Sequence, residues 1–223
     1  MNTRWLVRHV RVALVLSAAY LSACEAPTVA RPVAAYSPTS LTNGQLYRWP
    51  NGSTLRVWHI QPADSTRDVF RATQVALAEW NAVPRLREYR LESAPSLERA
   101  NIVIVDRSTP LPLSPAASCP FDARGSTGYT YFCVSGNRAL RLNTTGGGAT
   151  DVSVIIRLDV AGMASQAVLE SVVLHEMGHA LGIGGHSPET ADVMFGNPTA
   201  RFLSGRDVQT LQFLLGERPQ FTL

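Results

Sequence analysis

The stretch SQAVLESVVLHEMGHALG, residues 165–182, constrains the local structure more than any other part of the chain. Ser165 favours the N-cap position, the first twelve residues contain neither proline nor glycine, and Gly182 is a natural stop. The stretch therefore predicts a helix. On a helix, His175 and His179 lie one turn apart on the same face, so both imidazoles can reach one ion.

The residue types in this stretch suit a zinc site. Zinc favours imidazole nitrogen, and a catalytic zinc site keeps three protein ligands, one open position and a bound water whose pKa falls to about 7. Glu176 projects toward such a water and can take its proton. The five-residue motif HEMGH is weak evidence alone, and the third ligand has candidates in His186, Glu189 and Asp192.

The residues after the motif carry a family resemblance. HEMGHALG followed by HS and ADVMF resembles the metzincin signature H-E-x-x-H-x-x-G-x-x-H with its methionine turn, and is most similar to the matrixin branch. That pattern would put the third histidine at position 185, which is Gly185 here. We expect the Gly184-Gly185 pair to absorb the extra residue as a bulge, because glycine accepts backbone angles closed to other residues. His186 then becomes the third ligand, and Met194, eight residues later, lies beneath the metal as a support.

The resemblance implies a fold and an activity. The expected fold class is α+β, with a mixed twisted sheet, two long helices and a C-terminal helix. The expected activity is that of a zinc endopeptidase with one catalytic Zn²⁺ on His175, His179 and His186, with Glu176 as general base. The alternative is a catalytically degenerate member of the same fold that acts as a binding module. Calcium could bind in the Asp- and Gly-bearing loops, but no EF-hand spacing supports it.

Local patterns predict the other elements. A capping box of Ser204 with Asp207 begins a second predicted helix over 204–216, and His59 is expected to be a packed or surface histidine. The segment 110–150 is rich in Pro, Gly, Ser and Thr, and predicts loops and an edge strand. The remaining predictions are a helix over 68–83 and strands over 55–60, 101–106 and 152–159.

The first residues indicate export. A basic stretch and a short apolar run precede Leu21-Ser22-Ala23-Cys24, which resembles the lipobox of bacterial lipoproteins. We therefore expect a signal peptide over 1–23, a lipidated Cys24 with a flexible tether over 24–45, and a matrixin-like domain over 46–223. The expected location is the cell envelope outside the cytoplasm, with the outer membrane favoured where there is one. The alternative is ordinary cleavage nearby and a soluble secreted product.

The cysteine count and the charge limit the partners. Once Cys24 takes lipid, Cys119 and Cys133 remain as a pair in an oxidising compartment, which predicts a disulfide; the alternative is two unpaired thiols. The net charge of +3 comes from three arginines in the first eleven residues, so nothing suggests nucleic acid. The expected partners are a protein or peptide substrate and a membrane reached through the lipid anchor, while the oligomeric state stays open.

Overall fold

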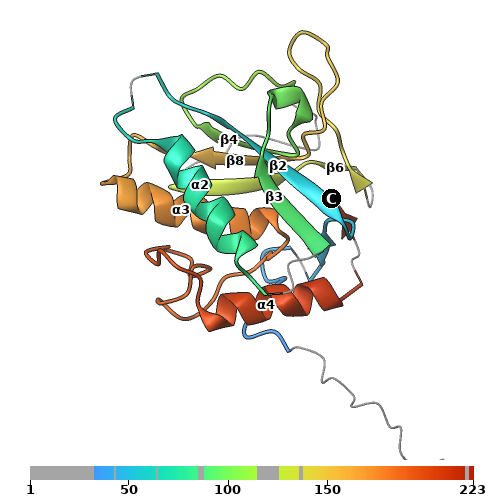
Figure 1. The fold of residues 1–223 in the computed structure, drawn as a ribbon, viewed down its shortest axis with the longest axis vertical. Coiled ribbons are helices and arrows are strands. Elements are labelled where there is room, and N and C mark those ends of the chain that lie inside the picture. The colour runs from blue at the N-terminus through green and yellow to red at the C-terminus, as the bar shows by residue number, and fades with distance from the viewer. Residues whose placement is uncertain are drawn as a thin grey trace, which may run out of the picture. The chain divides into compact units, whose positions relative to one another are not determined.

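The computed structural model describes residues 33–42, 44–63, 65–84, 88–114, 126–135, 138–218 and 221–223. Over these residues the protein has an α+β fold, with a five-stranded sheet, a small four-stranded sheet and three α-helices (Figure 1). The predicted signal over 1–23, Cys24 and Cys119 lie outside the described residues.

The five-stranded sheet has the strand order β3-β2-β4-β8-β5. Its first four strands run parallel, and β5 pairs antiparallel with β8 at one edge. β4 is buried along its whole length, as its β-branched sequence IVIVD predicts. The strands are β2 (Ser53–Ile60), β3 (Tyr89–Ser93), β4 (Ile102–Asp106), β5 (Gly128–Phe132) and β8 (Val154–Leu158). The mixed sheet and the edge strand between 110 and 150 are therefore confirmed.

The small sheet joins four two-residue strands in the order β1-β9-β7-β6. These are β1 (Tyr47–Arg48), β6 (Val134–Ser135), β7 (Arg138–Ala139) and β9 (Phe221–Thr222). Strand β3 was not predicted. Only Tyr89 and Leu91 of its five residues are buried, and this alternation is too short to stand out from the charged residues between them.

The three helices are α2 (Val69–Asn81), α3 (Gln166–Ala180) and α4 (Gly205–Gly216). Their N-caps are Asp68, Ser165 and Ser204, and the predicted capping box of Ser204 with Asp207 is present. α2 and α3 pack on one face of the five-stranded sheet, with α4 farther from it (Figure 1). α3 is buried on every side from Leu169 to Ala180, including its polar residues, which makes it the central helix of the core.

Folded structure begins earlier than Leu46. Residues 33–42 of the predicted tether over 24–45 belong to the compact unit, in which Tyr36 is 7% exposed. The hydroxyl of Tyr36 donates a 2.9 Å hydrogen bond to Asp207 in α4. Residues 33–42, called here the N-terminal segment, are therefore part of the domain, although their sequence has no helix or strand period.

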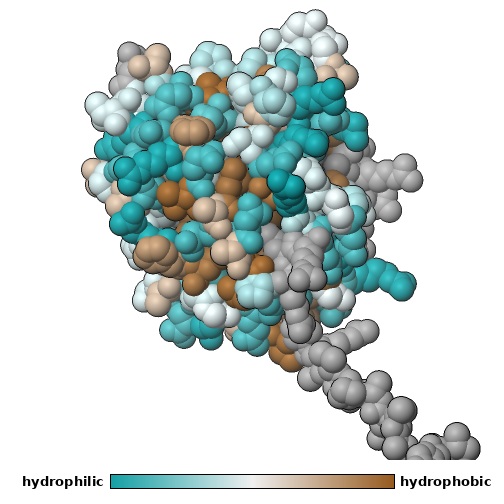
Figure 2. Space-filling model, viewed as in Figure 1, coloured by the Kyte–Doolittle hydropathy of each residue, from teal (hydrophilic) through white to brown (hydrophobic). Residues whose placement is uncertain are grey.

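The face drawn in Figure 2 is mainly hydrophilic. Figure 2 shows polar side chains over most of one face, with smaller apolar areas among them around α2. Leu41 and Tyr129 are 58% and 49% exposed and line the cleft described below. No helix among the described residues is long and apolar enough to cross a membrane.

Candidate metal centre

The end of α3 sets the geometry of the site. Gly182 has a φ of 106°, which glycine adopts without strain. Its N–H donates to His179 O, and Ile183 N–H donates to Gly178 O, the two hydrogen bonds of a Schellman motif. The predicted stop at Gly182 is therefore confirmed, and the chain reverses directly after His179.

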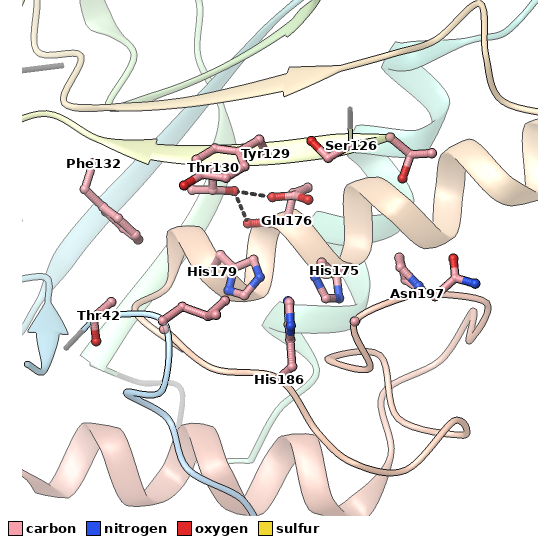
Figure 3. Close-up of a pocket in the computed structure, with 16 residues that line it drawn as sticks. Thr42, Ser126, Tyr129, Thr130, Phe132, His175, Glu176, His179, His186 and Asn197 are labelled. Carbon is pink, nitrogen blue, oxygen red and sulfur yellow. Dashed lines mark hydrogen bonds between the residues drawn. The ribbon is translucent and has the colours of Figure 1, made fainter. Parts of the chain in front are cut away.

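Three histidines meet beside this reversal (Figure 3). One ligand atom from each of His175, His179 and His186 lies within 4.8 Å of the others. His175 Nδ1 is 2.8 Å from Val193 O, and His179 Nδ1 is 2.6 Å from Ile183 O. A carbonyl oxygen only accepts, so each Nδ1 carries the hydrogen and each Nε2 keeps its lone pair for a metal. The cluster can therefore hold a metal ion.

The electrostatics of the cluster keep the imidazoles neutral. Burial, together with the neighbouring histidines, lowers the pKa of His175 to about 4 and that of His179 to about 3. His186 is partly exposed, and desolvation lowers its pKa as well. Neutral imidazole is the form that binds a metal, so protons compete weakly for this site at neutral pH.

Glu176 lies next to the histidine cluster with a buried carboxylate. It is 5% exposed, and Thr130 Oγ1 in β5 donates a 2.6 Å hydrogen bond to its Oε2 (Figure 3). A Cβ at Gly128 would lie 2.7 Å from Glu176 Oε1, so only glycine leaves room there for the carboxylate. Desolvation raises the pKa of Glu176 to about 7, and the hydrogen bond from Thr130 opposes part of that rise.

Met194 is buried against the turn of α3 that carries the two helical histidines. A Cβ at Gly178 would lie 2.3 Å from Met194 Sδ, which explains why glycine precedes His179. The backbone around Met194 is held by Asp207, whose two carboxylate oxygens accept the N–H groups of Val193 at 2.9 Å and Met194 at 3.2 Å. Since Val193 O also accepts from His175, Asp207 is connected to a side chain of the histidine cluster through one residue.

Gly184 and Gly185 differ from expectation in their backbone. Neither is among the described glycines with positive φ, so the extra residue is not accommodated by angles reserved for glycine. Instead, a Cβ at Gly185 would lie 2.0 Å from Ser37 O, and a Cβ at Gly184 would lie 2.4 Å from Thr42 Cγ2. Both positions need glycine because the N-terminal segment passes against them.

The other candidate ligands lie apart from the cluster. Among the described residues, the only group of three or more side chains placed to share a metal is His175, His179 and His186. Asp192 is buried and accepts hydrogen bonds from Ser187 Oγ and from Arg206 Nε, the latter at 2.9 Å. Glu189 is exposed. His59 packs against Phe70 with ring centroids 5.2 Å apart, as a packed or surface histidine would.

A cleft of about 710 Å³ opens above the histidines and Glu176. Edge strand β5 lines it with Gly128, Tyr129, Thr130 and Phe132, and the N-terminal segment lines it with Leu41 and Thr42. Gly196, Asn197 and Pro198, two to four residues after Met194, also line the cleft. The site therefore combines a possible metal centre, a buried carboxylate and an edge strand in one open cavity.

Several of these residues were not predicted as parts of the site. Thr130 and Gly128 come from a segment that reads only as loops and an edge strand, and Asp207 was predicted only as a capping residue. A single sequence shows no signal for contacts across such distances.

Cys133 is buried and disulfide-bonded, while its predicted partner Cys119 and the predicted lipid site Cys24 lie outside the described residues.

Comparison with known proteins adds no assignment: no protein-family model matches the chain, and no curated protein matches it.

Proposed function

We propose that this protein is a zinc-dependent endopeptidase resembling the matrixin branch of the metzincins. The observation that carries the proposal is the shared position of three neutral imidazoles and the buried carboxylate of Glu176 in one cleft beside an edge strand. His175, His179 and His186 would hold the zinc, because their nitrogen donors match its preference and two of them are oriented by carbonyl oxygens.

The zinc, when bound, would lower the pKa of a coordinated water and polarise the scissile carbonyl. Glu176 then serves as general base and later returns the proton to the leaving amine. A pKa near 7 suits both steps, because the carboxylate can take and release a proton at neutral pH. Thr130 orients this carboxylate from β5.

The cleft favours a peptide as substrate. β5 is the edge strand of the sheet, and an extended peptide can add to such an edge by backbone hydrogen bonds. Tyr129 and Leu41 supply exposed apolar surface along the cleft for the substrate's side chains. A binding module that holds peptides without cleaving them would use the same cleft, so catalysis has to be tested directly.

Glu176→Gln separates the enzyme from the binding module. The amide keeps the size of the side chain and an oxygen to accept from Thr130, but it cannot accept the proton from water. We expect peptide cleavage to fall by about 10²–10⁴-fold, the usual contribution of general-base catalysis, while zinc content and fold are retained. The assay should use a broad peptide library and purified, zinc-loaded full-length protein.

Two results would contradict the endopeptidase. One is a folded, zinc-loaded wild-type protein that cleaves nothing in the library; the other is a Glu176→Gln variant that cleaves as fast as wild type. In the first case, peptide binding without cleavage supports the binding module.

Metal content tests the ligand set independently of activity. His186→Ala should weaken zinc binding by more than about 100-fold, since loss of a residue that merely supports a ligand already costs about 10–100-fold. Glu189→Ala is the matched control and should retain full zinc. If His186→Ala keeps wild-type zinc affinity, the proposed ligand set is wrong.

A further inference from the structure

The loop between the second and third histidines contacts the start of the domain at every glycine it contains. Cβ atoms at Gly182, Gly184 and Gly185 would lie 2.2 Å from Tyr47 O, 2.4 Å from Thr42 Cγ2 and 2.0 Å from Ser37 O. Leu41 N–H also donates a 2.7 Å hydrogen bond to Gly184 O. Residues on both the N-terminal segment and strand β1 are therefore in contact with the loop from the end of α3 up to the residue before His186.

The N-terminal segment is itself attached to α4. Tyr36 donates to Asp207 at 2.9 Å, and Ala35 N–H donates to Thr210 Oγ1 at 3.2 Å. Gln209 Nε2 donates to Val33 O at 2.7 Å. These bonds connect the segment to the helix that also holds the backbone of Val193 and Met194, so its position is determined by the domain core.

The glycines of this loop show which contact decides its path. Gly182 has a positive φ that ends α3, but Gly184 and Gly185 do not. An alanine at either position would meet no backbone restriction of its own. Its Cβ would instead meet the N-terminal segment, so either that segment or the loop carrying His186 would have to move.

We propose that the N-terminal segment is a positioning element for His186: it packs on Gly184 and Gly185 and thereby holds the third ligand, displaced by one residue, within reach of the other two. This inference rests on the proposed metal site. The segment also supplies Leu41 and Thr42 to the cleft wall, so the same ten residues shape the substrate cavity and the metal site (Figure 3).

Cobalt binding to the full-length protein tests this role, because the visible spectrum of Co²⁺ reports its coordination. The variants are Gly184→Ala, Gly185→Ala and the double variant Gly184→Ala with Thr42→Ser. Serine removes the Cγ2 that would lie 2.4 Å from the new Cβ, and it keeps the hydroxyl that bonds Thr39 O and Gln45 O and would lie 3.0 Å from that Cβ. Gly205→Ala is the control for a glycine-to-alanine change, since a Cβ there meets nothing within 4 Å.

We expect Gly184→Ala and Gly185→Ala to bind Co²⁺ about 10–100-fold more weakly, the usual effect of losing support for a ligand. Their spectra should shift toward that of His186→Ala, while Gly205→Ala matches wild type; Thr42→Ser alone is the reference for the double variant. Thr42→Ser should restore part of the affinity lost in Gly184→Ala, because it removes the nearest of the three contacts to the new Cβ. Such rescue would not occur if the alanine acted through general destabilisation.

Two outcomes would overturn the inference. One is wild-type affinity and spectrum in both alanine variants, which would mean that the segment moves and the loop does not. The other is failure of Thr42→Ser to rescue Gly184→Ala. If Gly185→Ala does not fold, as judged by circular dichroism, the test rests on the Co²⁺ affinities of Gly184→Ala and of its double variant with Thr42→Ser. A wild-type protein that binds no Co²⁺ or Zn²⁺ would instead contradict the proposed function, and this inference with it.

Discussion

Thr130 Oγ1 donates a hydrogen bond of 2.6 Å to Glu176 Oε2, joining the edge strand of the sheet to the buried carboxylate of α3. The donated hydrogen stabilises the ionised carboxylate and lowers a pKa that burial otherwise raises. Strand β5, which lines the cleft, therefore also lowers the pKa of the proposed general base.

Removing that hydrogen bond should shift the pH profile of kcat/KM for peptide cleavage. Thr130→Val keeps the shape of the side chain but loses the donor, so the pKa of Glu176 rises further above its usual value. The base must be ionised to accept a proton, so the acid limb of kcat/KM should move to higher pH. Thr130→Ser keeps the donor and should leave the limb in place. An unmoved acid limb in Thr130→Val would mean that this bond does not control the base.

Asp207 should be important for both stability and metal affinity. It is fully buried and accepts four hydrogen bonds, from Tyr36, Val193, Met194 and Ser204. Asp207→Asn replaces one acceptor oxygen with a donor that faces N–H or O–H groups. Each unsatisfied buried group costs roughly 1–3 kcal/mol, so we expect a loss of roughly 2–5 kcal/mol in urea unfolding. Metal affinity should fall about tenfold, because Asp207 holds the backbone of Val193, whose carbonyl oxygen orients His175.

Tyr36→Phe is the comparison for this variant, because it removes only one of the four hydrogen bonds to Asp207. It should cost about 1 kcal/mol and leave metal affinity nearly unchanged. Equal losses in the two variants would show that the backbone bonds of Val193 and Met194 contribute little.

The metal-free protein should lose stability in mild acid. The folded pKa values of His175 and His179 are about 4 and 3, against 6.5 for the unfolded side chain, so below pH 6.5 the unfolded chain binds more protons. The stability that depends on these histidines is present above pH 6.5 and is lost as the pH falls from 6.5 toward 4. Glu176 has the opposite sign, because its folded pKa of about 7 exceeds the usual 4.5.

His175 and His179 against Glu176 leave about one net proton, and His186, whose pKa is also lowered, adds in the same direction. The free energy of unfolding should therefore fall by roughly 1.4 kcal/mol per pH unit between about pH 6 and 4.5. Urea unfolding in the presence of a chelator measures this slope. In His179→Gln one of these histidines no longer titrates, so the slope should fall by about 1.4 kcal/mol per pH unit. An equally steep slope in that variant would assign the pH dependence to other groups.

Membrane anchorage is predicted from Leu21-Ser22-Ala23-Cys24. Cys24→Ser should abolish lipidation, detected as loss of acyl mass and of partitioning into detergent. Ser22→Ala is the control, because it changes a neighbouring residue and keeps Cys24, and it should remain lipidated. Native protein without acyl groups would contradict the lipoprotein hypothesis and favour a soluble secreted product.

Local sequence was sufficient wherever one segment determines its own conformation. The caps of α3 and α4, the stop at Gly182 and the buried strand β4 follow from side chains within a few positions of one another. The same holds for His175 and His179, because a single helical turn separates them. The short strand β3 escaped prediction since two buried residues make no reliable period.

Contacts between distant segments needed the tertiary structure. The glycines before His186 could be recognised in the sequence, but the expected reason was backbone freedom, whereas the structure shows the N-terminal segment packed against them. Likewise, Asp207 was predicted as a helix cap, and its hydrogen bonds to Tyr36, Val193 and Met194 were not.

The sequence by itself determined the helical pair of histidines, the carboxylate beside them and the elements that present them, because helical spacing and capping are local. Only the tertiary structure decided that His186 completes the cluster, that Thr130 and Gly128 surround Glu176, and that residues 33–42 belong to the domain. Those relationships depend on close packing and hydrogen bonds between segments up to about 170 residues apart, as for Tyr36 and Asp207. A local sequence pattern does not predict which distant segment will contact a given residue.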